Sequence, residues 1–407
     1  MDNQQYKLLF LAAMVCNATM AAVQPADIAA GPISITPFIQ IEQGYDDNIY
    51  SASIEEDIKD SFYTILSPTI EAVAEDGLNA YRASFLLQKG VYYASSRDNF
   101  LDYDAVLDAH IETDARNSFD ISARISDRHE AQGTGIAEFN NTAYDVDKPL
   151  RYDELALSGS YTHGAETAQG QLIIDVGYED KQYTNFRDIT TFRDTEIFYA
   201  GAALQYQAKP KTSLLLEARY KDIDYITDYD SSLDSTTLRL LAGLSWEASA
   251  RTTGTIKLGR VERHLPSPTR DDFSGNSWQA ILLWSPRTYS TFRISTSQTE
   301  KESNNRADFI NSQAIRLSWN HRWNDQFLSV IRLGKTHDEF IGSLNNQGNR
   351  LANNRVDDSD HVSIELNYDL RRWLSIGGSW TMQDTESNVR GIPFKRNVFA
   401  ISVDASL

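Results

Sequence analysis

The sequence is nearly free of cysteine and poor in proline. Among 407 residues only Cys16 is a cysteine, and 10 residues are prolines. Cys16 lies in an N-terminal segment that we expect to be removed, so the mature chain has no disulfide and is not a small disulfide-stapled domain. The scarcity of proline, with only 21 glycines, leaves little material for linkers and favours a single domain.

Long apolar runs and positive charge are also scarce. No segment approaches the roughly 20 apolar residues of a transmembrane helix. The 38 Lys and Arg residues are outnumbered by 57 Asp and Glu residues, which gives a net charge of −19. Such a chain lacks the basic surface that phosphate contacts require, so we expect no nucleic-acid partner. The 20 Tyr, 17 Phe and 7 Trp exclude a disordered chain.

Residues 1–21 have the features of a secretory signal peptide. Lys7 ends a short n-region, and Leu8–Cys16 (LLFLAAMVC) supply the apolar h-region. Val15 is too large for the position before a lipoprotein cysteine. We expect cleavage after Ala21, which leaves residues 22–33 as an N-terminal periplasmic segment.

Apolar and polar residues alternate with period two along the mature chain. In Ser118–Arg128 the odd positions from Phe119 to Ile125 are apolar and the even positions are polar, and Thr237–Glu247 and Phe399–Leu407 repeat the pattern. About 18 segments of roughly 9–14 residues show it, the length of a tilted strand that crosses a bilayer. The segments around residues 200 and 257 alternate poorly, so a count of 16 strands remains open.

The connections between these segments are alternately short and long. Glu75–Leu78 and Lys209–Lys211 are short, whereas Asp46–Ser61, His264–Asn276 and Asp338–Asp358 are long. A soluble β-sandwich has no reason to sort its loops in this way, but outer-membrane barrels have short periplasmic turns and long extracellular loops. We therefore predict that residues 34–407 form an all-β, transmembrane, antiparallel up-and-down barrel in the outer membrane of a Gram-negative bacterium, in contact with lipid and lipopolysaccharide.

Aromatic residues gather at both ends of the predicted strands, as expected for girdles at the water–lipid boundaries. Those beside short turns are Trp246, Trp284, Tyr289, Trp319, Trp323, Tyr368 and Trp373, and those toward long loops are Tyr45, Tyr93, Tyr103, Tyr178, Tyr220 and Trp278. Lys89 does not fit, because it falls on the lipid face of its segment. Either a bulge at Leu86-Leu87 or a lysine that extends to the outer boundary would resolve this conflict.

A barrel of about 16–18 strands is too wide for its own side chains to fill, so we expect a water-filled channel. Charged residues on the polar faces are the candidate lumen residues: Asp104, Asp108, Glu112, Arg124, Arg128, Arg219, Arg239, Arg293, Arg316 and Arg332. Facing acidic and basic walls would create a transverse field that selects solutes. The alternative is that cross-strand charge pairs only stabilise the wall.

The loops leave further alternatives. Glu130–Pro149 either folds inward as a constriction or projects outward. Asp228–Asp234 (DYDSSLD) is expected to be a solvated acidic loop rather than a calcium site, because the EF-hand spacing is missing. His129 and His337 lie near the long-loop rim, but no nucleophile–base pair or metal spacing accompanies them. We therefore predict no enzyme, no cofactor and no metal.

The segment Gly44–Tyr50 (GYDDNIY) carries a family resemblance. With Pro37-Phe38 before it and Leu66-Ser67-Pro68 after it, it resembles the opening of the putative beta-barrel porin type 2 family. The shared turn consists of Tyr45, Asp46, Asp47, Asn48, Ile49 and Tyr50, and we expect its acids and Asn48 to form an Asx-type turn that closes the first hairpin. A cation or glycan site there is the less favoured alternative.

The resemblance implies an outer-membrane channel that takes part in exporting a surface exopolysaccharide or capsule. Polysaccharide and export machinery of the periplasm and inner membrane would then be its partners. Two other hypotheses remain open: a diffusion porin for small polar solutes with Glu130–Pro149 as its constriction, and an outer-membrane enzyme or adhesin whose loops carry the function.

Overall fold

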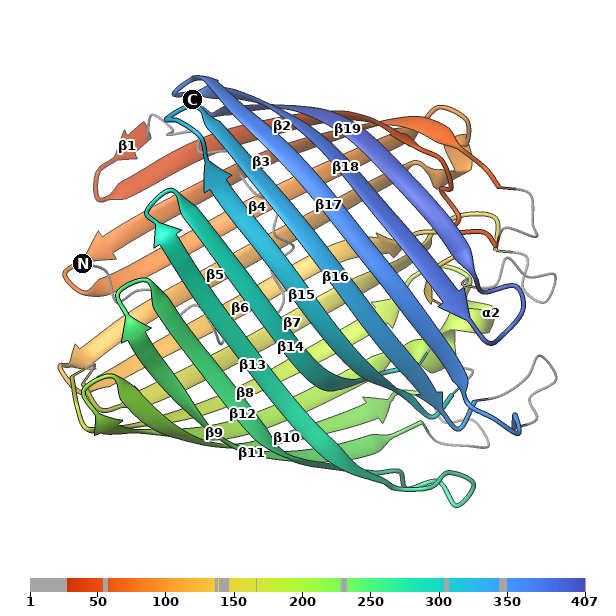
Figure 1. Cartoon of the computed structure of the whole chain (residues 1–407). Helices are drawn as coiled ribbons and strands as arrows, with labels where there is room; N and C mark the ends of the chain where they lie inside the picture. The colour runs from red at the N-terminus through yellow and green to blue at the C-terminus, as the bar shows by residue number, and fades with distance from the viewer. Residues whose placement is uncertain are drawn as a thin grey trace.

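The chain forms one closed β-barrel, which is seen from the side in Figure 1. This computed structural model describes residues 28–53, 58–135, 138, 146–165, 167–227, 233–303, 307–343 and 350–406. The expected signal peptide therefore lies outside the described residues. Antiparallel pairing runs from each strand to the next through the chain, and β19 pairs with β2 to close a ring of 18 strands.

Each strand of the ring is long enough to cross a bilayer at a tilt. The strands are β2 (Ile33–Asp46), β3 (Ser61–Asp76), β4 (Asn79–Tyr92), β5 (Phe100–Asp114), β6 (Asn117–Glu130), β7 (Leu150–His163), β8 (Gly170–Tyr183), β9 (Thr195–Lys209), β10 (Thr212–Tyr225), β11 (Ser235–Ser249), β12 (Thr252–His264), β13 (Phe273–Arg287), β14 (Ser290–Lys301), β15 (Phe309–Arg322), β16 (Phe327–Ile341), β17 (Arg355–Arg371), β18 (Leu374–Ser387) and β19 (Phe394–Ser406). A short strand, β1 (Ile28–Ala30), pairs with the start of β2 and stands outside the ring.

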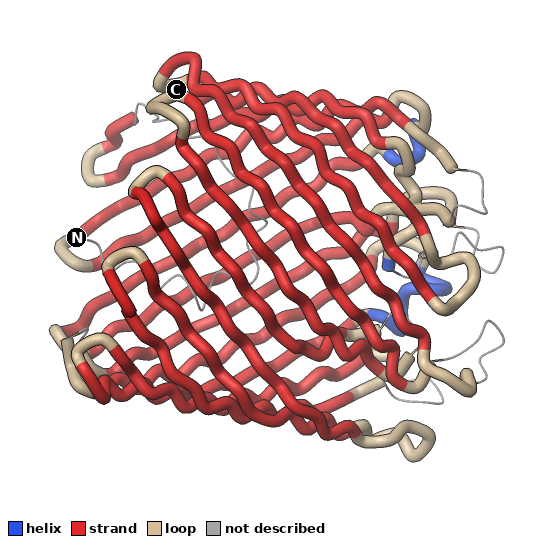
Figure 2. Tube along the Cα trace, viewed as in Figure 1, coloured by secondary structure: helices blue, strands red, loops and turns tan. Residues whose placement is uncertain are grey.

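The two ends of the barrel differ. All short turns lie at one end, and the long loops lie at the other with α2 (Arg187–Thr190) and the 3-10 helices η2 (Ser96–Asp98) and η4 (Thr191–Arg193). Figure 2 shows helix only among these loops. No helix in the described ranges has the length and apolar character needed to cross a membrane.

The predicted strands are confirmed, including the poorly alternating segments around residues 200 and 257, which are β9 and β12. Some boundaries were wrong. The loop expected at Asp338–Asp358 shortens to residues 342–354, and the one expected at His264–Asn276 shortens to residues 265–272. Strands continue through these charged residues because backbone pairing persists beyond the apolar band. The barrel also begins at Ile33 rather than residue 34.

Apolar side chains cover the outer face of the wall. Ile125, Leu157, Leu216 and Ile401 are all more than 40% exposed, which a membrane barrel requires because lipid replaces water there. The aromatic residues of both predicted girdles end on the outer face or in the turns, and pairs such as Tyr45–Phe62 and Trp284–Phe292 contact one another.

Lys89 lies on this outer face, where it pairs in register with Leu66 on β3 and Leu101 on β5. The β3–β4 ladder keeps its register on both sides of Leu86-Leu87, so the bulge is wrong. Lys89 stands three residues before the long-loop end of β4. This position agrees with the other explanation, a lysine whose alkyl stem extends to the outer boundary so that its ammonium group stays in water.

One seam of the wall differs from the rest. The β13–β14 ladder ends at Gln279–Ser297, although β13 starts at Phe273 and β14 continues to Lys301. Beyond Ser297, β14 passes over the inner face of β10–β12. Two ion pairs indicate this path: Glu300 pairs with Arg239, and Glu302 pairs with Arg263 at 2.7 Å. Here the wall is double, and we call this region the overlap.

Candidate functional site in the barrel lumen

Strand register places all ten predicted lumen residues on the inner face. Asp104, Asp108 and Glu112 alternate along β5, and Arg124 and Arg128 lie beside them on β6. Arg219 on β10 is opposite Arg239 on β11. Arg293, Arg316 and Arg332 come from β14, β15 and β16. They share one face because residues two apart along a strand point the same way.

The β5–β6 side of the lumen is acidic, and its carboxylates are paired with neighbouring strands. Asp104 pairs with Arg128 and lies 3.5 Å from Arg124. Asp108 accepts a 2.7 Å hydrogen bond from Ser122 and lies 3.8 Å from Arg82. Cross-strand pairing therefore accounts for much of this charge.

His110 lies between Asp120 at 2.6 Å and Glu112 at 3.4 Å on the same inner face. A histidine held by carboxylates on both ring nitrogens is oriented by them. Among the described residues, no group of three or more His, Cys, Asp or Glu side chains is arranged to hold a metal ion.

The β10–β16 side is basic. Glu217 is buried between Arg219 at 2.6 Å and Lys257 at 2.7 Å, and Arg219 also reaches Asp175 at 3.4 Å. Arg239 pairs with Glu300 of the overlap, and Arg332 pairs with Glu365. Arg293 and Arg316 differ, because neither has a carboxylate within 4.0 Å in the part of the chain that is described. Most lumen charges are thus paired with a neighbour of opposite sign. The lumen is nevertheless polarised, with an acidic side at β5–β6 and a basic side at β14–β16.

Aromatic rings lie flat on the inner wall toward the long-loop end. Tyr63 covers Gly44, Phe100 covers Gly90 and Tyr199 covers Gly177, each on the neighbouring strand. A Cβ at these glycines would stand 2.1–2.3 Å from the ring, so only glycine leaves room for it. Tyr63 is only 5% exposed and Phe100 is also stacked on His129, so of the three rings it is Tyr199 that remains partly exposed to the lumen. The sequence analysis missed these rings, although their period-two positions among polar residues assign them to the inner face.

More rings gather on the neighbouring strands. Tyr152 and Tyr183 are 5.8 Å apart, and the Lys181 ammonium lies 3.9 Å from the Tyr152 ring centre. Lys181 Nζ and the Tyr183 hydroxyl both donate to Glu130, at 3.0 and 2.5 Å. His129 stacks on Phe100 at 4.0 Å and bonds Asp102 at 2.8 Å. Flat rings therefore alternate with hydrogen-bonding groups around the mouth.

The loop expected at Glu130–Pro149 folds inward where it is described. Gly133 packs against the carbonyl of Tyr50 in the loop between β2 and β3. Glu138 accepts bonds of 2.6 and 2.9 Å from Arg355, the first residue of β17. Since β2–β5, β18 and β19 separate β6 from β17 around the ring, this ion pair spans part of the mouth.

Arg355 is the centre of that contact. It is 4% exposed, its Nε lies 3.0 Å from Asp357, and its guanidinium stacks 4.0 Å from the centre of the Phe340 ring. Asp308 forms a second contact, with Arg270 and Arg350 each at 3.0 Å. No periodic signal marks these residues in the sequence, because their partners come from distant loops.

The turn motif joins the first strand of the ring, β2, to the last strand, β19. Asp46 accepts the Asn48 N–H at 3.0 Å, the Asx-type bond that the sequence predicted. Asp46 also binds Arg396 Nε at 3.0 Å, Asp47 accepts from Asn397 at 2.6 and 2.8 Å, and Asn48 donates to the Lys395 carbonyl at 3.1 Å. We call this set of contacts with β19 the clasp.

The other residues of the motif hold the loop in place. Ile49 is buried. Tyr45 donates to Asp60 at 2.8 Å, and Tyr50 donates to Asp98 at 3.0 Å. Burial raises the pKa of Tyr50 above its usual value, so it remains a donor at neutral pH. Nothing in these contacts requires a bound ligand.

His337 bonds Asp358 at 3.1 Å on the outer face, away from His129. The structure therefore does not bring these two histidines together. Most of the acidic loop Asp228–Asp234 lies outside the described residues; its last member, Asp234, accepts the Tyr225 N–H at 2.8 Å.

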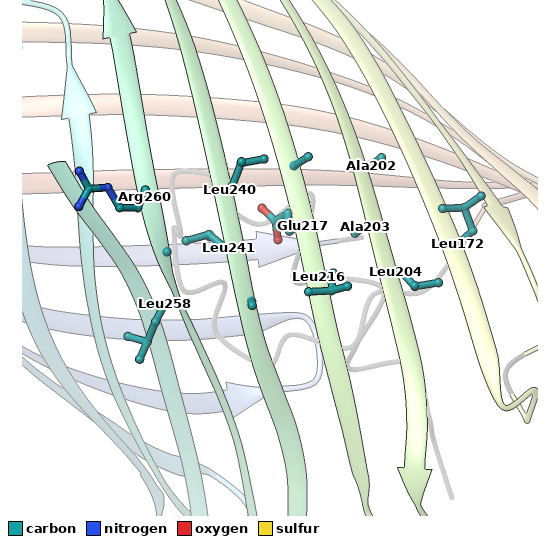
Figure 3. A pocket seen from close by; sticks show the side chains of 13 residues that line it. Leu172, Ala202, Ala203, Leu204, Leu216, Glu217, Leu240, Leu241, Leu258 and Arg260 are labelled. Carbon is teal, nitrogen blue, oxygen red and sulfur yellow. The ribbon is translucent and has the colours of Figure 1, made fainter. Parts of the chain in front are cut away.

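A hollow of about 510 Å³ lies on the outer face of β8–β12. Leu204, Leu216, Leu240 and Leu258 rise around small residues such as Ala202, and Arg260 stands at its edge (Figure 3). These side chains face lipid, so the hollow is a feature of the membrane surface and not of the lumen.

Comparisons with known proteins agree with this architecture. A family model described as putative beta-barrel porin 2 matches residues 21–407. No curated protein matches the chain.

Solved structures give the same fold at low identity. The chain is 10% identical to the FrpB iron transporter apoprotein (F5-1 variant) from Neisseria meningitidis, with a TM-score of 0.52, and the alignment covers 86% of this chain and 62% of that one. Another F5-1 structure of that transporter has 9% identity and a TM-score of 0.52, and covers 95% and 83%. The outer membrane protein opdK from Pseudomonas aeruginosa has 11% identity and a TM-score of 0.45, and covers 92% and 99%. The chain thus spans less than two thirds of the first transporter structure, and the likeness concerns the barrel fold alone.

Proposed function

The chain belongs to the putative beta-barrel porin 2 family, and from this premise we propose that it exports a surface polysaccharide, an exopolysaccharide or capsule, across the outer membrane. The family and the fold make it an outer-membrane barrel of the porin type. The proposal concerns its cargo, an extended glycan that passes through the lumen.

The observation that carries the proposal is the flat ring of Tyr199, which lies over Gly177 on the inner wall and is partly exposed to the lumen. A sugar ring has an apolar C–H face and a rim of hydroxyls, and flat aromatic surfaces suit that face. Carboxylates such as Glu42, which accepts from Tyr63 at 2.9 Å, and Glu130 supply acceptors for the hydroxyls. A chain of sugars needs many weak contacts of this kind, because tight binding at one site would stop transport.

The direct test is a clean deletion of the gene, with polysaccharide measured on the cell surface and in the periplasm. We expect surface glycan to fall and periplasmic glycan to accumulate. A copy with Tyr199→Phe should restore export, because the ring is retained, whereas Tyr199→Ala should restore less at equal barrel abundance. Unchanged surface glycan with altered uptake of small solutes would overturn the proposal.

The Glu138–Arg355 ion pair favours a second candidate, a diffusion porin for small polar solutes that is narrowed at its mouth. Planar-bilayer recordings separate the two candidates. A glycan conduit is blocked in a length-dependent way by neutral oligosaccharides, whereas a narrow porin excludes them and conducts small ions undisturbed.

An outer-membrane enzyme or adhesin remains the third hypothesis. Its candidate residues are His129, which is held by Asp102, and His337, which is held by Asp358. Loss of the enzymatic or adhesive activity on replacing the His129 or His337 region, with the channel intact, would favour this hypothesis, and unchanged activity would count against it.

A further inference from the structure

The inner wall of β14–β17 carries cations that alternate with small residues. One register row reads Arg293, Ser318, Arg332 and Ser363 from β14 to β17, and the next row reads Ser295, Arg316, Gly334 and His361. Cations in one row are therefore offset by one strand from cations in the other. We call this set the basic patch.

The small residues keep the cationic groups accessible. Arg316 and His361 flank Gly334, where an added Cβ would lie 3.8 Å from Arg316 Cγ and 3.6 Å from His361 Cβ. Both Arg316 and His361 are exposed although they point into the barrel. Serine at the other intervening positions adds hydroxyl groups without covering the guanidinium groups.

Charge in the basic patch is largely uncompensated within the described chain. Arg332 pairs with Glu365, but Arg293 and Arg316 have no carboxylate within 4.0 Å there. On the acidic side, by contrast, Arg82 lies 2.6 Å from Glu71 and Arg124 lies 3.5 Å from Asp104. The patch is thus a cationic surface that faces an acidic wall.

We propose that the basic patch binds carboxylate groups on the transported glycan, so that the cargo is an acidic polysaccharide carrying uronate sugars. This inference rests on the proposed export function. A guanidinium group recognises a carboxylate through paired N–H donors, and adjacent arginines place such sites along the path. The acidic wall of β5–β6 repels the same polymer and keeps it against the patch.

The test uses the purified full-length barrel in planar bilayers, with oligogalacturonate and maltooligosaccharide of equal length as blockers. In the native channel the acidic oligomer should block more strongly. The double variant Arg293→Gln/Arg316→Gln should weaken acidic block by roughly tenfold, as loss of charge-assisted contacts implies, and leave neutral block unchanged. Its reversal potential in a KCl gradient should move toward cation selectivity.

Charge-matched and shape-matched variants serve as controls. Arg82→Gln/Arg124→Gln removes the same charge from the acidic wall and should keep the preference for the acidic oligomer. Arg293→Lys/Arg316→Lys keeps the charge, so it should keep the reversal potential and lose part of the acidic block. Folding of each variant is checked by its compact migration on unheated SDS gels.

The outcomes separate this inference from the proposed function. Equal block by both oligomers in the native channel would overturn the acidic cargo and leave a glycan conduit. Absence of block by either oligomer would overturn the conduit itself. Acidic block that survives both glutamine substitutions at native strength would remove the basic patch from the binding path.

Discussion

At the residue scale, Asp46 connects the first and last strands of the barrel. Its carboxylate is 1% exposed and binds both the Asn48 amide and the Arg396 guanidinium. The β19–β2 ladder ends at Val398–Asp46, so the clasp lies where backbone pairing stops. A short polar turn can in this way secure the closure of a ring.

We predict that Asp46→Ala destabilises the barrel by about 2–3 kcal/mol, because it leaves Arg396 without its buried partner. The measurement is the temperature at which the barrel loses its compact migration in SDS. Asp60→Ala is the control, since Asp60 is exposed and accepts a hydrogen bond from Tyr45 at the rim. Equal melting of both variants would refute the clasp as a stabilising contact.

A second residue-scale prediction concerns Gly177. An alanine methyl there would lie 2.1 Å from the Tyr199 ring, so the ring must leave the wall. We expect Gly177→Ala to cost about 1–3 kcal/mol and to weaken block by neutral oligosaccharides. Gly378→Ala should change neither quantity, because no atom lies within 4 Å of its added methyl. Unaltered oligosaccharide block in Gly177→Ala would argue against the Tyr199 ring as a sugar contact.

At the element scale, each strand has one face for lipid and one for water. On β5, Leu107 is 61% exposed on the outer face, while Val106 faces inward between Asp104 and Asp108. Adjacent residues of one strand therefore face lipid and water in turn. This alternation produces the period-two pattern of apolar and polar residues in the sequence.

We predict that Leu107→Lys costs about 2–4 kcal/mol, the penalty for lysine near the bilayer midplane, whereas Val106→Lys is close to neutral. The lysine at 106 would face water and nearby carboxylates. Reversible unfolding in urea from lipid vesicles gives both values. A larger cost at 106 than at 107 would mean that the register of β5 is assigned incorrectly.

The sequence supports prediction of the elements better than of their contacts. Lipid imposes alternation on every strand, so the inner face of Arg124 or Arg332 can be read from its neighbours. Which carboxylate reaches Arg239 depends on the path of β14, and Arg355 meets Glu138 only because a loop folds inward. Such contacts join residues far apart in sequence, and no local pattern encodes them.

At the scale of the whole molecule, the barrel is a closed ring, and the chain enters and leaves it at the seam between β19 and β2. Both chain ends of the ring lie at the short-turn end, and Ile33 extends beyond the last pair at Phe38–Ser406. A linker of about six residues bridges this gap, at roughly 3.3 Å per residue.

We therefore predict that a circular permutant, with Ser406 linked to Ile33 and the chain opened at Pro210-Lys211, forms the same barrel when residues 1–21 precede it. Each strand pair of the ring is retained, and the clasp lies at the opposite end from the new linker. Single-channel conductance equal to that of the native chain is the expected result. A permutant that inserts but conducts differently would show that chain order shapes the lumen.

The overlap changes the kind of contact that sets the circumference of the barrel. At most seams, backbone hydrogen bonds along the whole strand fix the perimeter. Above Gln279–Ser297, the perimeter depends on side-chain attractions such as Glu300–Arg239 and Glu302–Arg263. Glu300 and Arg263 are each only 2% exposed, and salt screens such buried pairs much less than exposed ones. We therefore expect the upper perimeter to change little with the salinity outside the cell.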